Sequence, residues 1–166
     1  MEALAAFLGK IGNYNLLNNL IPGAILCVLL KYLVGYDFMN VGTLELLVIF
    51  YFVGMVNGRI GSLIVEWFFE KIKFVTFRDH KLFVAAEQKD NKITSLSETN
   101  NMYRSMISVV FTVLIVKVYH VGVDLQWDWG NISEWVVLVA LLVLFACAYR
   151  KQTSYIVSRI DCHTKA

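Results

Sequence analysis

The sequence is poor in the residues that mark disulfide-rich, collagen-like and nucleic-acid-binding proteins. Its 166 residues include one proline, ten glycines and three cysteines, and 17% of the side chains are charged. Cys27, Cys147 and Cys162 have neither paired nor metal-ligand spacing, and the two that lie in apolar stretches, Cys27 and Cys147, are interpreted as small hydrophobic residues. The formal net charge is only +2, and no basic run is interleaved with aromatic residues. We therefore predict no direct contact with nucleic acid.

Catalytic and metal-binding motifs are missing as well. His80, His120 and His163 each lack carboxylates or thiols at ligand spacing, so we expect no metal ion and no cofactor. The chain contains no nucleophile elbow, no zinc-protease motif and no glycine-rich phosphate loop. We therefore predict that the protein is not an enzyme. A carrier is also disfavoured, because there is no internal repeat from which inverted halves could form.

The sequence is rich in long apolar segments. Hydrophobic residues make up 58% of the chain, and the mean hydropathy is +0.60. These values predict an all-α, polytopic membrane protein that forms a single membrane domain over residues 1–166 and contacts membrane lipid. The expected elements are four transmembrane helices and a small helical cytoplasmic layer: spans at about 14–34, 41–60, 103–121 and 132–150, and the layer at about 61–102.

The basic residues predict the topology. All of the fifteen lysines and arginines except Lys31 and Lys117 lie in the N-terminal segment, the central region or the tail. By the positive-inside rule these three parts face the cytoplasm, so both termini are expected there.

One long segment, Val41 to Lys73, has no proline and is predicted to be a single helix. Its apolar part exceeds the ~30 Å hydrocarbon thickness, so it either tilts steeply or crosses the membrane and continues into water. Gly54, Gly58 and Ser62 follow one another at i, i+4 and i+8, with Arg59 beside them. This spacing of small residues is typical of close helix packing, either between spans or between the subunits of a homo-oligomer.

The first span carries a polar stripe. Asn15, Asn18, Asn19 and Pro22 recur at i, i+3, i+4 and i+7 on one face, and a kink is expected at the proline. Amides at membrane depth need polar partners or water. They either join helices by hydrogen bonds or form the polar lining of a pore or of a cavity at the subunit centre.

Glu45 opens the second span and belongs to the same polar intramembrane set as the asparagines and Arg59. It is either interfacial and close to solvent, or a buried partner of Lys31 or Lys117. Lys117 itself is expected to extend outward from the last turn of its span.

The central region, about 61–102, alternates in charge and is too short to form an independent core. Short helices are expected at Ala85–Glu87 and at Ile93–Asn101, so the region needs neighbours in an oligomer or a soluble partner to pack on. Candidate partner-docking residues are Arg78, Lys81, Glu87, Tyr103 and Arg104.

Two segments carry a resemblance to a known group of proteins. NYNLLNNLIPG at 13–23 and NNMYR at 100–104 are similar to small four-span proteins of bacterial anti-phage defence loci. These include the membrane subunit of two-gene systems such as Kiwa and the four-span effectors of nucleotide-signalling systems. The resemblance implies a bacterial inner-membrane oligomer that works with a soluble cytoplasmic protein.

Two functions are therefore expected in order. The first is an oligomeric membrane platform or sensor that docks a soluble cytoplasmic partner. The second is a pore-forming effector that disrupts the membrane on a signal.

Overall fold

The computed structural model describes residues 16–124 and 132–164, and side chains over 18–122 and 132–164. All secondary structure in these ranges is helical, which confirms the all-α prediction. The elements are η1 (Leu16–Leu20), α3 (Ile21–Val34), α4 (Thr43–Ile60), η2 (Gly61–Glu66), α5 (Trp67–Lys71), α6 (His80–Glu87), α7 (Asn91–Asp124) and α8 (Ile132–Thr164).

Three helical stretches within the described ranges are long and apolar enough to cross a membrane: Thr43–Lys71, Asn91–Gly122 and Ile132–Thr164. Asn18–Val34 is a shorter apolar helix. These 17 described residues account for ~25 Å of the ~30 Å hydrocarbon core. The π-helical turn η1 leads into Pro22 near the start of α3. A π turn absorbs the local mismatch of hydrogen bonds that a proline introduces.

The segment predicted as one helix from Val41 to Lys73 is helical from Thr43 to Lys71, through α4, η2 and α5. Lys73 ends it with a positive φ of 56°, a conformation that cannot continue a right-handed helix. The π-helical η2 places Gly61 against α7, where an added Cβ would lie 3.3 Å from the Arg104 carbonyl oxygen.

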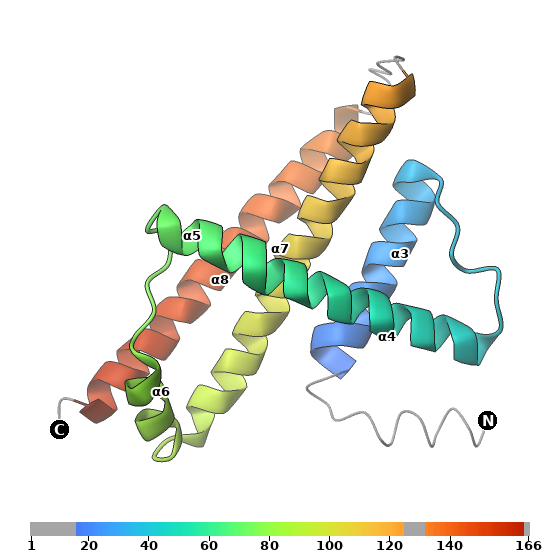
Figure 1. Cartoon of the computed structure of the whole chain (residues 1–166). Coiled ribbons are helices and arrows are strands. Elements are labelled where there is room, and N and C mark those ends of the chain that lie inside the picture. The colour runs from blue at the N-terminus through green and yellow to red at the C-terminus, as the bar shows by residue number, and fades with distance from the viewer. Residues whose placement is uncertain (1–15, 125–131, 165–166) are drawn as a thin grey trace.

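The α4 helix crosses its neighbours instead of lying alongside them. Its contacts with α3 centre on Gly54, which packs on Asn19 and Gly23, and those with α7 centre on Arg104 to Ser108. Figure 1 shows α4 and α5 lying across α3 and α7. The helix is therefore steeply inclined to α7 and α8, and both arrangements expected for it relative to a membrane stay predictions.

The helices α7 and α8 form the longest packed pair. Residues Ile93–Asn101 and the span from 103 were predicted as separate elements, but they belong to one helix, Asn91–Asp124. No glycine or proline interrupts residues 91–121, so nothing in the backbone ends the helix between them. The main apolar core joins α3, α7 and α8, through Leu26, Val109, Val110, Val113 and Leu138.

The polar ends of α7 and α8 also support the central region. Ala86 of α6 is buried against Ile93, Ile156 and Ile160, with Phe83 and Leu96 around them. The deduction that this region must pack on an oligomer neighbour or a soluble partner is therefore wrong. Its packing surface comes from the same chain, because both long helices continue past their apolar segments.

Candidate functional site

A buried polar contact joins α4 to α7. Asn57 is 1% exposed, and its Nδ2 donates to the carbonyl oxygen of Ser105 at 3.0 Å. The hydroxyl of Ser108 donates to the Asn57 carbonyl oxygen, also at 3.0 Å. Oδ1 of Asn57 has no hydrogen-bond partner, a loss of about 1–3 kcal/mol for a buried acceptor. The only sequence signal for this residue is an asparagine inside an apolar run.

Beside this contact lies a polar cavity of about 280 Å³, here called the asparagine cavity. It lies between η1, α4, η2 and α7, and among the described lining residues the charged ones are arginines and none is acidic. Its lining consists of Asn18, Asn19, Tyr51, Met55, Gly58, Arg59, Ser62, Asn101, Arg104 and Ser105.

A second cavity of about 370 Å³, the α6 cavity, lies between η2, α5, α6, α7 and α8. Asn101 and Arg104 line both cavities, and Glu66 lines the second. The Arg104 guanidinium pairs with the Glu66 carboxylate. This ion pair therefore stands between the two cavities. Its Arg104 Nε is buried without a hydrogen-bond partner, so the guanidinium is not fully satisfied by Glu66.

The structure brings together most of the predicted polar intramembrane set. Asn18 is buried, Asn19 is half-buried, and both line the asparagine cavity with Arg59, which is exposed on α4. Asn15 lies outside the described residues. Glu45 is not part of the group, because it sits at the far end of α4.

Glu45 caps its own helix. Its Oε2 accepts the N–H of Gly42 at 3.1 Å, and its side chain is exposed. Lys31 pairs with Asp37 at 3.1 Å, and Lys117 pairs with Glu134 of α8. Neither lysine is the partner of Glu45, so this alternative is wrong.

Lys117 also departs from the expected outward extension, because it is only 5% exposed. Its ammonium lies 5.4 Å from the ring centroid of Trp135 in addition to its pairing with Glu134. A carboxylate one turn into α8 thus keeps the lysine inside the α7–α8 interface.

Gly54, Gly58 and Ser62, here called the small-residue ridge, lie in three different environments. A Cβ on Gly54 would lie 1.8 Å from the Asn19 carbonyl oxygen, so this glycine makes backbone contact with the first helix of the same chain. At Gly58 the nearest atoms would be 3.9 Å away, at the edge of the asparagine cavity. Ser62 donates its hydroxyl to the Arg59 carbonyl oxygen at 3.1 Å and also lines that cavity.

Several of the candidate docking residues have intramolecular partners. Arg78 forms a two-point pair with Asp161 of α8, at 2.8 and 2.6 Å, and this carboxylate raises the arginine pKa. Glu87 accepts a hydrogen bond from Thr94 at 2.9 Å. Arg104 pairs with Glu66. Tyr103 is half-buried beside the cluster of Val65, Val75, Ile107 and Tyr149, and Lys81 is exposed.

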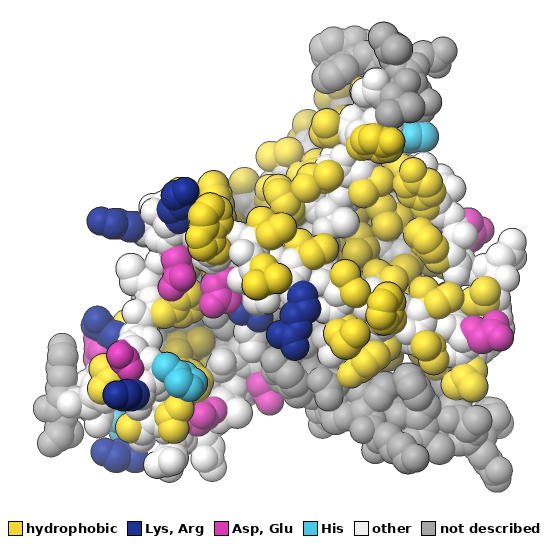
Figure 2. Space-filling model, viewed as in Figure 1, with side chains coloured by type: hydrophobic (Ala, Val, Ile, Leu, Met, Phe, Trp, Pro, Cys, Tyr) yellow, Lys and Arg dark blue, Asp and Glu magenta, His cyan; other side chains and the backbone are white. Residues whose placement is uncertain are grey.

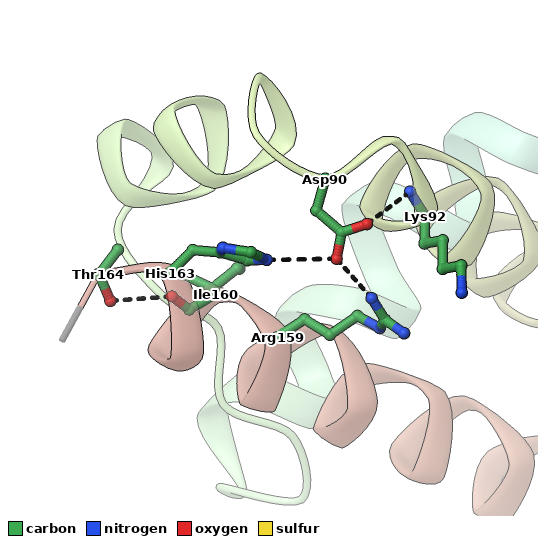
Figure 3. Close-up of polar contacts among 6 residues, drawn as sticks. All are labelled: Asp90, Lys92, Arg159, Ile160, His163 and Thr164. Atoms are coloured by element: carbon green, nitrogen blue, oxygen red, sulfur yellow. Dashed lines mark hydrogen bonds and ion pairs between the residues drawn. The ribbon is translucent and has the colours of Figure 1, made fainter. Parts of the chain in front are cut away.

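The turn into α7 is held by Asp90, as Figure 3 shows. One carboxylate oxygen accepts the backbone N–H of Lys92 at 3.0 Å, and the other pairs with Arg159 and lies 3.4 Å from Nε2 of His163. The Lys92 N–H, followed by Arg159 and His163, lowers the pKa of Asp90. The start of α7 is thereby tied to the end of α8.

A groove of about 460 Å³ runs beside this contact, between the start of α7 and the end of α8. It is here called the α7–α8 groove. It is lined by Lys92, Ser95, Leu96, Tyr155, Ser158 and Arg159. None of these was a candidate in the sequence, because the groove exists only if both helices extend well beyond their apolar segments.

No group of three histidine, cysteine, aspartate or glutamate side chains that could hold a metal ion occurs in the described part of the chain. Comparisons with protein-family models, curated proteins and solved structures find no match.

Proposed function

We propose that this protein is a homo-oligomeric platform or sensor subunit of the bacterial inner membrane that docks a soluble cytoplasmic protein in anti-phage defence. In this proposal both termini and the α6 layer are cytoplasmic. The distribution of lysines and arginines supports that orientation. Apolar residues exposed on α4 and α8, such as Phe52 at 59% and Val136 at 61%, would contact lipid or a second copy.

The observation that carries the proposal is the continuity of α7 and α8 from their apolar segments to their polar ends. Each is one unbroken helix, of 34 and 33 residues, and the α7–α8 groove lies at their polar ends. A partner that spreads or closes this groove acts directly on the helices that would cross the membrane. A rigid helix transmits such a displacement with little loss.

The chemistry of the groove favours an acidic partner segment with an apolar anchor. Lys92 supplies positive charge, Arg159 shares its charge with Asp90, and Lys151 lies 5.8 Å from the ring centroid of Tyr155. Leu96 and the half-exposed Tyr155 offer an apolar floor. Aromatic and basic residues of this kind are enriched where proteins bind one another.

The test is co-purification of the full-length chain with the soluble product of the neighbouring gene, expressed together. We expect Lys92→Glu to reduce capture strongly, because it places a like charge opposite an acidic segment. Lys73→Glu is the matched control, since it makes the same charge change at an exposed position outside the groove that is not a docking candidate. Equal capture by both variants would remove the groove from the proposal, and no capture by the wild type would remove the docking function.

A pore-forming effector is the second candidate, and the asparagine cavity is the observation that favours it. Asn18, Asn19 and Arg59 line polar space at the level where α4 crosses α3. However, this cavity lies between helices of one chain, which favours the platform over a path between subunits.

Expression without a partner separates the two functions. A pore would depolarise the membrane, and Asn19→Leu would abolish the effect, whereas the control Asn40→Leu in the exposed 35–42 connection would not. The platform predicts no depolarisation from any of the three chains.

A further inference from the structure

We propose that the asparagine cavity binds the phosphate head group of an anionic phospholipid. The inference rests on the membrane location in the proposed function, but it does not depend on the α7–α8 groove or on a protein partner.

The first reason is the charge of the cavity. Arg59 and Arg104 are its charged lining residues, and Glu66, which pairs with Arg104, lines the α6 cavity instead. Among the described residues, the pair leaves Arg59 as the positive charge at the cavity without an ion-pair partner. Basic pockets between membrane helices on the cytoplasmic side are suited to anionic head groups.

The second reason is the supply of polar hydrogens. Arg59 and Arg104 carry guanidinium donors, and the Nε of Arg104 is buried without an acceptor. The hydroxyl of Ser105 lies in the same lining, whereas that of Ser62 already donates to the Arg59 carbonyl oxygen. A phosphate offers several strong acceptors to such a set, and arginine binds it in a two-point geometry.

The third reason is the apolar surface beside the cavity. Met55 lines the cavity and is 41% exposed, and Phe52 and Leu63, on either side along the helix, are 59% and 73% exposed. Figure 2 shows hydrophobic side chains over much of the face formed by α4. A free phosphate would leave this apolar surface exposed, whereas the acyl chains of a phospholipid would cover it.

The volume of the cavity suits a head group. About 280 Å³ is just below the range of about 300–1,000 Å³ that is usual for pockets enclosing a whole drug-sized ligand. A phosphoglycerol head group fits such a space, with its chains outside along α4.

The experiment measures lipid binding to the full-length protein, delipidated in a mild neutral detergent. Native mass spectrometry and thermal unfolding would be recorded with short-chain phosphatidylglycerol, short-chain phosphatidylcholine, glycerol 1-phosphate and inorganic phosphate. We expect phosphatidylglycerol to bind and to raise the unfolding temperature, with much weaker effects from the other three. Equal binding of inorganic phosphate, or of phosphatidylcholine, would overturn the proposal.

Two variants locate the site. Arg59→Gln should weaken phosphatidylglycerol binding about fivefold, as expected for one basic residue near a membrane surface. Lys73→Gln removes the same charge from an exposed position outside both cavities and should leave binding unchanged. Gly58→Leu fills the cavity with a larger side chain and should also reduce binding.

An equal loss in Arg59→Gln and Lys73→Gln would indicate diffuse charge attraction and would refute the site. Retained binding in Gly58→Leu, with Arg59 intact and the chain folded, would do the same. Failure of lipid binding leaves partner capture at the groove unaffected, so the two proposals fail separately.

Discussion

Gly54 and Gly58 lie about one helical turn apart on α4, but the structure predicts that the same added methyl group has opposite effects on stability at the two positions. A Cβ at Gly54 would lie 1.8 Å from the carbonyl oxygen and 2.6 Å from the carbonyl carbon of Asn19. Both atoms belong to the backbone, so no side-chain rotation relieves the overlap. A Cβ at Gly58 would meet only side-chain oxygens of Asn19 and Ser105, each at 3.9 Å.

The expected magnitudes follow from this difference. In Gly54→Ala, α3 and α4 must move apart by roughly 1.2 Å, because a Cβ atom essentially never lies closer than 3.0 Å to such a neighbouring atom. Overpacking typically destabilises by about 1–3 kcal/mol, and a rigid backbone acceptor places this case at the upper end. For a chain of this size that corresponds to a fall of roughly 5–10 °C in the unfolding midpoint. Gly58→Ala gains up to about 1 kcal/mol of helix propensity and should be neutral or stabilising.

The assay is thermal unfolding of the full-length protein in mild detergent, followed by circular dichroism, with gel filtration of each variant. Wild-type stability of Gly54→Ala would refute the close contact between α3 and α4. If both variants were equally destabilised and both lost their oligomeric state, the ridge would pack against a second subunit instead. That outcome would also contradict the open space beside Gly58 from which the lipid site is argued.

Two further predictions concern ion pairs. Glu66→Gln and Arg104→Gln should each destabilise the protein, because the carboxylate and the guanidinium share one partly buried contact. In chemical unfolding, the double variant should show a coupling energy of about 0.5–3 kcal/mol between the two substitutions. Additive effects would contradict this pairing. The pKa of Asp90 is lowered by the Lys92 N–H and then by Arg159. Its stabilisation is therefore complete above the ordinary carboxyl pKa of about 4 and is lost as the pH falls through the lower folded value. The stability difference between the wild type and Asp90→Asn should thus be present at about pH 5 and shrink below about pH 4, and a difference that does not change with pH would speak against the contact.

The sequence predicts those features that depend on local composition. The helix from Thr43 to Lys71 follows from the absence of proline and of strong turn signals, and the connection before Gly42 follows from the polar residues after α3. The spacing of Asn18 and Asn19 correctly grouped two side chains that line the same cavity.

Features that depend on how helices meet could not be predicted in this way. The contact of Asn57 with Ser105 and Ser108 spans about fifty residues, and no periodicity within α4 distinguishes it from a solvated amide. The course of α4 across α3 is decided by the backbone contact at Gly54, which resembles ordinary small-residue packing in the sequence. The α7–α8 groove can be predicted only from the full lengths of both helices. In the sequence, however, the polar ends of these helices have the pattern of loops and short helices.

The close contact between Gly54 and Gly23 limits the ways in which α4 can move. An added Cβ at Gly23 would lie 1.8 Å from the Phe50 carbonyl oxygen, as close as one at Gly54 would lie to the Asn19 carbonyl oxygen, so the two backbones meet at this crossing point. Sliding along the axis would push larger neighbours into that point, but a scissor-like rotation about it breaks few contacts. The free movement of α4 is then angular, with the crossing as a pivot. Spin labels at Leu44 and Leu63 should change their distances to α3 when the protein responds, whereas labels near the pivot should not.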